Sequence, residues 1–492
     1  MFPFDIHKIA ELLKYNPDEP LLFNSGLFLF LFTGFLWLYI ALSPTQKPKL
    51  IFVILFSWYF YYKSSGQYFV LLILAAIIDF TLAQLIYYAR EKSLKKLFIA
   101  LTLVVNLGLL AYFKYTNFLF DSFYWLYGRE FEPFDIFLPV GVSFFTFQSL
   151  SYTLDVYRGN IKPVENIIDY AFFVSFFPQL VAGPIVRAAD FLPQIDKPTF
   201  ITKEMFGRAV FLIGCGLFKK AVISDYISTN FVDRVFDAPT LYSGLENLFA
   251  VYGYALQIYC DFSGYSDMAI GIALLLGFHF PINFDSPYQS QNITEFWRRW
   301  HISLSTWLRD YLYISLGGNR KGEVRTFLNQ MITMLLGGLW HGASWRFIIW
   351  GALHGLSLSV HKYFRRFRSA EPKPKTRWRK IRNILYTFHF VCFCWIFFRA
   401  SSMEIVGQML TQIFTQFNIQ ILFQFIAGYK GVVMLMMIGY VLHFIPREVE
   451  VSFQEKLTSL PFVYKAAWMI VIIILVMQTK SAGVQPFIYF QF

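Results

Sequence analysis

Residues 21–42 read LLFNSGLFLFLFTGFLWLYIAL, a segment without a single charged side chain. A helix of this length measures ~33 Å at ~1.5 Å per residue, which is enough to cross the hydrocarbon core of a bilayer. The whole chain has the same character, because 56% of its 492 residues are hydrophobic and only 15% are charged. A soluble protein of this length would need far more polar surface. We therefore predict an all-α, polytopic integral membrane protein.

Similar apolar segments recur along the chain, and their number predicts about ten to twelve transmembrane helices. They lie at residues 68–88, 97–112, 167–186, 205–223, 245–259, 268–280, 327–339, 345–361, 384–398, 431–445 and 464–477. Residues 51–62 are short for a span, and residues 134–152 contain Pro139 and Gly141, which favour a broken or re-entrant helix. We expect one membrane domain over residues 21–492, preceded by an interfacial N-terminal extension at residues 1–20.

The formal net charge of +12 comes from clusters between the apolar segments. The strongest cluster, residues 362–382, holds ten Lys or Arg residues against Glu371, and a second one spans Arg90 to Lys96. Positive loops of this kind mark the cytosolic side of a membrane protein and contact its lipids. The aromatic platforms and grooves that read nucleic acid are missing, so we expect no nucleic-acid partner.

The stretch GGLWHGASW, residues 337–345, places His341 inside a strongly apolar region. A helix from His341 to the basic cluster at Lys362 climbs ~30 Å, which puts the histidine at mid-depth or nearer the outer side. The glycines beside it predict that the helix breaks there, and irregular backbone at membrane depth survives only in protein or against a watered cavity. Polar groups at this depth are costly and usually functional.

A second histidine, His301, lies in FWRRWHISLSTWLRDYLYI, residues 296–314, which we predict to be one helix opened by a capping box from Asn292 to Glu295. One face carries Trp297, Trp300, His301, Leu304, Leu308 and Tyr311, and the other carries Arg298, Arg299, Ser305, Arg309 and Asp310. Such a helix could lie at the cytosolic interface and direct His301 into the bundle. Neutral imidazole can take a proton from a hydroxyl, so His301 and His341 are a candidate catalytic pair. The alternative is that each is a core histidine hydrogen-bonded to a backbone carbonyl.

Other polar residues are weaker candidates for a substrate channel. They are Trp340, Arg298, Arg309, Asp310, Arg187 in VAGPIVR, and Asp261, Ser263, Tyr265 and Asp267 in DFSGYSDMAIG. The last group predicts a polar break between two half-helices; a serine nucleophile there would lack the G-x-S-x-G elbow. Arg187 could meet an anionic substrate or simply snorkel to the interface. His354 and His361 share a helix face without an evident third ligand, so we expect no metal site.

The motifs FWRRWHISLSTWLRDYLYISLGGNR, GGLWHGASW and IYCDFSGYSDMAIG together resemble the membrane-bound O-acyltransferases (MBOAT). The similar branch is the bacterial one that contains the alginate O-acetyltransferase membrane subunit, which FFPQLVAGPIVR and the terminal PFIYFQF also fit. The resemblance implies a ring of tilted helices around a thin centre, with funnels from both faces meeting near the catalytic histidine. It places that histidine at His341 and an assisting one at His301.

The resemblance also implies the reaction. A cytosolic thioester, acetyl-CoA or an acyl-carrier-protein thioester, would donate an acyl group to hydroxyls of a cell-surface polysaccharide, directly or through a periplasmic or extracellular partner acyltransferase. No cofactor would be bound, and the protein would be a multi-pass component of the bacterial inner (cytoplasmic) membrane. His341 would act as general base or carry an acyl-histidine intermediate.

Several alternatives remain at this level. The acceptor could be alginate or another exopolysaccharide, peptidoglycan, or teichoic acid receiving D-alanine. A transporter of polysaccharide or lipid-linked sugar is a different class, which inverted repeats would support; none is apparent. A scaffold that only recruits an extracellular transferase is a third class, in which both histidines would tolerate substitution.

Overall fold

The computed structural model describes residues 6–17, 19–42, 46–197, 200–365, 376–479 and 485–488. Within these ranges the chain forms α-helices with short 3-10 and π-helical turns, and it forms no strand. The predicted all-α class is therefore confirmed. Part of the predicted basic cluster, the first residues of the N-terminal extension and the last four residues of PFIYFQF lie outside the described residues.

The chain divides into two compact units, which are described separately. Unit 1 contains Met1–Ile201 and Ile272–Phe280, and unit 2 contains Thr202–Gly271 and Pro281–Phe492. Whether they act as the single domain expected over residues 21–492 stays a prediction.

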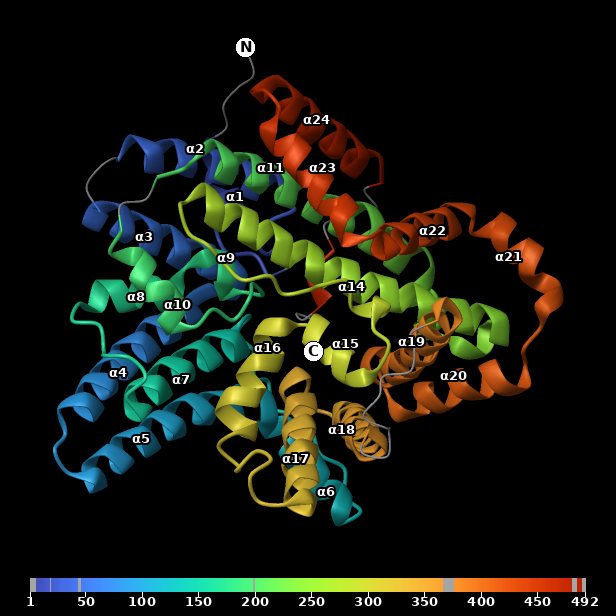
Figure 1. The fold of residues 1–492 in the computed structure, drawn as a ribbon, viewed down its shortest axis with the longest axis horizontal. Helices are drawn as coiled ribbons and strands as arrows, with labels where there is room; N and C mark the ends of the chain where they lie inside the picture. Colours follow the sequence, from blue (N-terminus) through green and yellow to red (C-terminus); the bar gives the residue numbers. More distant parts are fainter. Residues whose placement is uncertain are drawn as a thin grey trace. The chain divides into compact units, whose positions relative to one another are not determined.

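Unit 1 contains three long helices, α4, α5 and α7, each of which packs against the other two (Figure 1). Its helices are α1 Ile6–Leu13, α2 Gly26–Ala41, α3 Gln46–Ser65, α4 Phe69–Tyr88, α5 Lys92–Leu110, α6 Thr116–Leu126, α7 Val142–Arg158, α8 Ile167–Ser175, α9 Phe177–Leu180 and α10 Ala188–Ile195. The predicted break within residues 134–152 is confirmed, because α7 begins only at Val142. Gly141 precedes it at φ 76°, and a Cβ there would lie 2.7 Å from the Leu180 carbonyl oxygen.

Unit 2 carries both candidate histidines. Its helices are α11 Lys203–Leu217, α12 Asp225–Ile227, α13 Asp233–Asp237, α14 Gly244–Leu275, α15 Ile293–Arg299, α16 Ile302–Trp307, α17 Glu323–His341, α18 Trp345–Arg365, α19 Arg377–Arg399, α20 Met403–Thr415, α21 Leu422–Gly428, α22 Lys430–Phe444, α23 Arg447–Ser459 and α24 Phe462–Thr479. The last residues of α14 cluster with unit 1. Short 3-10 and π-helical turns join several of these helices, among them η3 Phe218–Ser224 and η7 Leu308–Tyr313.

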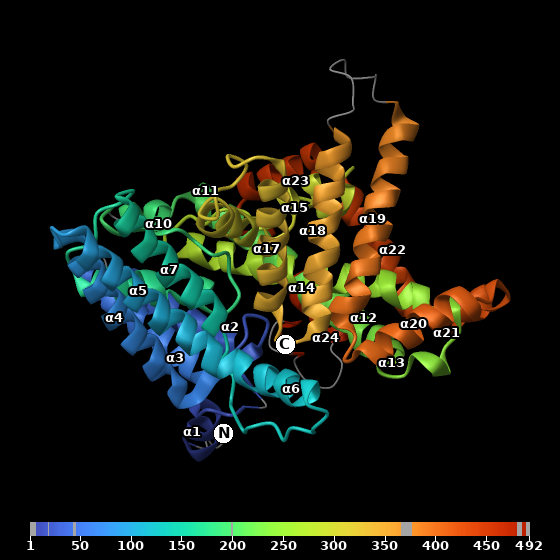
Figure 2. The same cartoon turned by 90° about the horizontal axis from the view of Figure 1, so that it is seen from below.

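Helices α17, α18 and α19 run side by side in unit 2 (Figure 2). The first two approach closely because glycines face the partner backbone. A Cβ on Gly338 would lie 2.2 Å from the Phe347 carbonyl oxygen, and one on Gly351 would lie 2.3 Å from that of Met334. Small residues at such crossings let helix backbones touch in membranes, and here they fix the helix that ends in His341.

Four described helical segments are long and apolar enough to cross a membrane, and a fifth does so if a bent pair counts as one span. They are Lys47–Tyr88, Lys92–Leu126, Arg377–Arg399 and Phe462–Thr479, with the pair Ile419–Gly428 and Lys430–Phe444 bent by 96°. The chain is thus polytopic by length and composition of its helices. Residues 51–62, short in sequence, belong to the 20-residue helix α3. The expected total of about ten to twelve crossings stays a prediction.

The polar break predicted within DFSGYSDMAIG is wrong. Helix α14 runs without interruption for 32 residues, so the two spans expected at 245–259 and 268–280 are joined. The acidic side chains need no break to be satisfied, because they form ion pairs with the preceding helical segment: Asp261 with Lys220 and Asp267 with Lys219.

Candidate active site

His301 lies at a sharp break between two short helices. The capping residue Asn292 accepts the Glu295 N–H at 2.9 Å and opens α15, as the capping box predicts. The predicted single helix over residues 296–314 is wrong, however, because α15 ends at Arg299 and α16 begins at Ile302. Between them His301 adopts φ 42°, ψ 57°, a left-handed conformation that is uncommon for a residue other than glycine. Strain of this kind persists only where the surroundings enforce it, and it is concentrated at functional sites.

Asn283 enforces the break. Its carbonyl oxygen accepts the Ile302 N–H at 2.9 Å, and its Oδ1 accepts both the N–H of Ser303 at 3.2 Å and the Ser303 hydroxyl at 2.9 Å. Its Nδ2 donates to the Ser266 hydroxyl on α14 at 3.2 Å. A buried amide therefore replaces the helical hydrogen bonds that the break gives up. Nothing in the sequence distinguished this asparagine.

The hydrogen bonding of His301 defines its tautomer. Its Nδ1 accepts the Leu304 N–H at 3.2 Å, so Nδ1 carries no proton. Burial lowers the pKa of His301 to about 3, so the ring is neutral at physiological pH. The single ring proton must then reside on Nε2. This side chain is 0% exposed, and its Nε2 has no hydrogen-bond partner among the described residues. His301 therefore presents a buried donor without an acceptor, which is costly unless a ligand supplies one.

His341 is the last residue of α17, directly before Gly342, so the predicted helix break at the glycines is confirmed there. The side chain is 3% exposed. Aromatic rings surround the imidazole, with ring-centre distances of 5.1 Å to Trp340, 5.0 Å to Trp350 and 5.2 Å to Phe398. Trp340 also approaches His301 at 6.2 Å. One indole thus contacts both histidines, and the fold brings the predicted pair together.

An aromatic shell from α15, α18 and α19 supports this pair. Trp350 lies 4.7 Å from His354 and 6.0 Å from Trp395, measured between ring centres. His354 Nδ1 accepts the indole N–H of Trp297 at 3.3 Å, so it ties α15 to α18. Half of the 12 tryptophans of the chain lie between residues 297 and 350, whereas Trp395 and Phe398 of this shell come from α19.

The acidic candidates of α14 have structural partners. Asp261 forms an ion pair with Lys220 at 2.5 Å and accepts the Ile488 N–H at 2.9 Å. Asp267 pairs with Lys219 at 2.7 Å. The ring of Tyr265 lies 5.0 Å from that of Phe487. Ser263 is 1% exposed, and its hydroxyl has no hydrogen-bond partner within the described part of the chain.

Two of the three arginine candidates, Arg298 and Arg309, belong to unit 2. Arg298 and Arg309 are exposed, and Arg309 is paired with Asp310 at 2.6 Å. Arg187 directly precedes α10 in unit 1, and its part in a substrate channel stays a prediction. Across the described ranges, no group of three or more His, Cys, Asp or Glu side chains could hold a metal ion.

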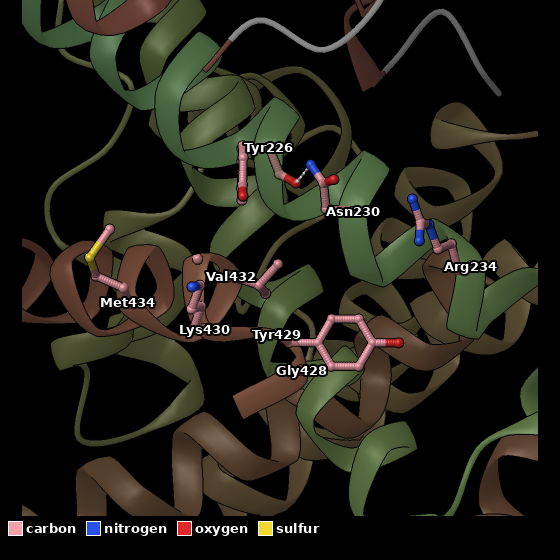
Figure 3. A pocket seen from close by; sticks show the side chains of 9 residues that line it. Tyr226, Asn230, Arg234, Gly428, Tyr429, Lys430, Val432 and Met434 are labelled. Atoms are coloured by element: carbon pink, nitrogen blue, oxygen red, sulfur yellow. Dashed lines mark hydrogen bonds between the residues drawn. The ribbon is translucent and has the colours of Figure 1, made fainter. Parts of the chain in front are cut away.

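A cavity of about 520 Å³ occurs elsewhere in unit 2 (Figure 3). Side chains from residues 226–234 and 428–434 line it, at the bend between α21 and α22, and they include Arg234 and Lys430. Neither His301 nor His341 is among its lining residues. The histidine pair is therefore an enclosed site and not part of this open cavity.

The fold and the site define a polytopic helical membrane protein with two buried imidazoles that contact one indole. The sequence model of MBOAT, the membrane-bound O-acyltransferase family, matches residues 54–407, and the chain belongs to this family. It is therefore a membrane-bound O-acyltransferase, as its motifs predicted.

Individual relatives agree with this assignment. The chain is 39% identical over 430 residues to a peptidoglycan O-acetyltransferase of Helicobacter pylori, covering 80% of each protein. It is 42% identical over 404 residues to the probable alginate O-acetylase AlgI of Azotobacter vinelandii, covering 80% of this chain and 78% of the relative. A teichoic acid D-alanyltransferase of Bacillus subtilis is 30% identical over 281 residues, which are 55% of this chain and 70% of that protein.

Proposed function

We propose that this chain transfers an acetyl group from a cytosolic thioester to hydroxyls of an extracytoplasmic polysaccharide, and that it does so in the bacterial cytoplasmic membrane. Two of the relatives above are named as O-acetyl-transferring enzymes, and all three are named for polymers of the cell envelope or cell surface. The donor is acetyl-CoA or an acyl-carrier-protein thioester, and the acceptor is reached directly or through a partner acyltransferase.

Within this proposal the two histidines have different tasks. His301 Nδ1 is occupied by the Leu304 N–H, so His301 cannot accept a proton there and offers only a donor at Nε2. That single observation supports a role for His301 in stabilising negative charge, with His341 as the general base. A donor preorganised at the position of a developing oxyanion is usually a large contribution to acyl transfer.

In the proposed reaction, the acyl group passes from the thioester to the acceptor hydroxyl through a tetrahedral intermediate. The acceptor hydroxyl gives its proton to His341 while its oxygen attacks the thioester carbonyl carbon, and the carbonyl oxygen becomes an oxyanion that His301 Nε2–H stabilises. The tetrahedral intermediate collapses with loss of the thiolate, which takes the proton from the His341 imidazolium. The products are an ester on the polymer and a thiol. The exposed arginines Arg298 and Arg309 are suited to attract an anionic donor to the cytosolic face.

The proposal is tested in cells that carry chromosomal His341→Ala, with base-labile acetate measured on isolated peptidoglycan and on soluble exopolysaccharide. Loss of the base should slow acetylation of one polymer by about 10²–10⁴-fold, so its acetate content should fall at an unchanged level of membrane-inserted protein. The polymer that loses acetate identifies the acceptor. If both polymers keep their acetate while the variant is inserted and folded, His341 is not the base.

A further inference from the structure

The described end of the chain, residues 485–488, is held inside unit 2 against α14. The Ile488 N–H donates to Asp261 Oδ2 at 2.9 Å, and Lys220 Nζ donates to the Pro486 carbonyl oxygen at 3.3 Å. Between these two backbone contacts, Phe487 is 0% exposed. Two backbone contacts and a fully buried ring hold this segment to unit 2, so it has a defined position beside α14.

The contacts come from a buried charge cluster. Lys220 pairs with Asp261 at 2.5 Å and with Asp225 at 2.7 Å, and the Lys220 and Asp261 side chains are each only 3% exposed. Buried ion pairs are stable only when further hydrogen bonds complete their geometry. The backbone of residues 486–488 supplies one donor to the carboxylate and one acceptor to the ammonium. The cluster therefore binds the main chain of the terminal segment and sets where the side chain of Phe487 points.

Phe487 connects this segment to the histidine site through one ring. It lies 5.4 Å from Phe262 and 5.0 Å from Tyr265, and Phe262 lies 4.5 Å from His301, all measured between ring centres. Phe262 is itself 0% exposed. The His301 ring is held at Nδ1 by the Leu304 N–H, and Phe262 packs against the same ring at an interplanar angle of 60°, so these two contacts together set the direction of Nε2–H.

We propose that residues 485–488 are a positioning element for His301: Lys220 and Asp261 clamp the backbone, Phe487 supports Phe262, and Phe262 holds the imidazole toward the acyl group. None of these four residues touches a reacting atom. The inference rests on the proposed function, because it needs His301 to act on the acyl group. It assigns Asp261, the buried carboxylate at the start of the DFSGYSDMAIG motif, to positioning and not to catalysis.

The test uses the full chain in lipid nanodiscs, with acetyl-CoA as donor. The acceptor is an oligosaccharide of the polymer that loses acetate in the His341→Ala cells. Phe487→Ala should lower kcat by about 10- to 100-fold, as expected when a catalytic group is misplaced by about 1 Å, and should leave KM for acetyl-CoA within about twofold. The matched control is Phe425→Ala, which removes a buried phenylalanine of unit 2 that packs on Phe231 and Tyr429. Its kcat per folded protein should stay within about twofold of the parent.

A double variant separates positioning from general destabilisation. If Phe487 acts through His301, Phe487→Ala combined with His301→Asn should be no slower than His301→Asn alone. Where Phe487→Ala does not fold, the same comparison of single and double variants is made with Phe487→Leu. Additive losses, or equal losses in Phe487→Ala and Phe425→Ala, overturn the inference. A normal rate in His301→Asn overturns the proposed role of His301 itself, whereas a slow His301→Asn with a normal Phe487→Ala overturns only the positioning role.

Discussion

Replacement of His301 by asparagine separates its structural role as the cap of α16 from its proposed role as the oxyanion donor. Its outcome is the most informative prediction from the site. Asparagine tolerates the left-handed backbone at φ 42° and can accept the Leu304 N–H through Oδ1, so it can keep the cap of α16. Its side chain is too short to place a donor where His301 holds Nε2–H. The substitution therefore removes the catalytic donor while it preserves the local fold.

The expected magnitudes follow from these contacts. Loss of one oxyanion donor costs about 10²–10³ in kcat, or about 2.7–4 kcal/mol of transition-state stabilisation. The stability cost should be about 1 kcal/mol, because two buried ring atoms are lost while the cap remains. His301→Ala would add the loss of the cap, about 1 kcal/mol, and a larger void at a fully buried position. Only the asparagine variant keeps a comparable fold.

The assay is the rate of thiol release from acetyl-CoA across pH 5–9. The midpoint of thermal unfolding is measured on the same preparation. Because burial lowers the pKa of His301 to about 3, this residue does not titrate in that range. His301→Asn should therefore lower the height of the pH–rate profile without moving its acid midpoint. A rate within about threefold of the parent would refute the donor role. A shifted acid midpoint would show that His301 is itself the titrating base.

Three further predictions concern the same site. Burial lowers the pKa of His301 below its unfolded value of about 6.5, so the unfolded state binds the extra proton and the free energy of unfolding should decrease as the pH falls below about 6.5. Because His301→Asn removes this titrating group, the variant should lose less thermal stability than the parent between pH 6.5 and 5. Gly338→Ala should destabilise the α17–α18 pair by about 1–3 kcal/mol in thermal unfolding, because its Cβ would meet the Phe347 carbonyl. The control Gly407→Ala has open space around the new Cβ and should be neutral or stabilising in the same measurement. Asn283→Leu should lower kcat by about 10-fold or more by releasing the backbone after His301, with circular dichroism confirming retained helix content.

Hydrophobic periodicity predicted most of the buried face of residues 296–314, although Trp297 of that face is only half-buried and the periodicity did not predict the backbone. It also missed three buried side chains: Phe296, Ser303 and Trp307. Trp300, His301, Leu304, Leu308 and Tyr311 are buried as expected. Burial is encoded by the local alternation of apolar and polar residues, which a helix broken into two short pieces still satisfies. The break itself depends on Asn283, which precedes the segment and bonds to it only in the folded chain. No local pattern reports such a contact.

The opposite error occurred in α14, where a polar sequence predicted a break that does not exist. Polar residues inside an apolar region need partners, and a local break is one way to supply them. Lys219 and Lys220 supply them from a different helical segment. Both lysines lie inside the span predicted at residues 205–223, and nothing in that segment indicates that they pair with α14. The pairing could be found only from the fold, and so could the capture of Phe487.

Enclosure of the two imidazoles also has a chemical consequence. A general base beside a thioester activates water as readily as it activates a polymer hydroxyl, so the site must exclude water until the acceptor is present. Indole and phenyl rings around His341, which is 3% exposed, provide that exclusion. The same dry surroundings keep His301 neutral, and among the described residues its Nε2–H has no hydrogen-bond partner. A hydrogen bond formed there is stronger than in water. In the proposed reaction it would form fully only when the carbonyl oxygen becomes an oxyanion. Since catalysis depends on interactions that are stronger in the transition state than in the ground state, an unfilled donor is what this step requires.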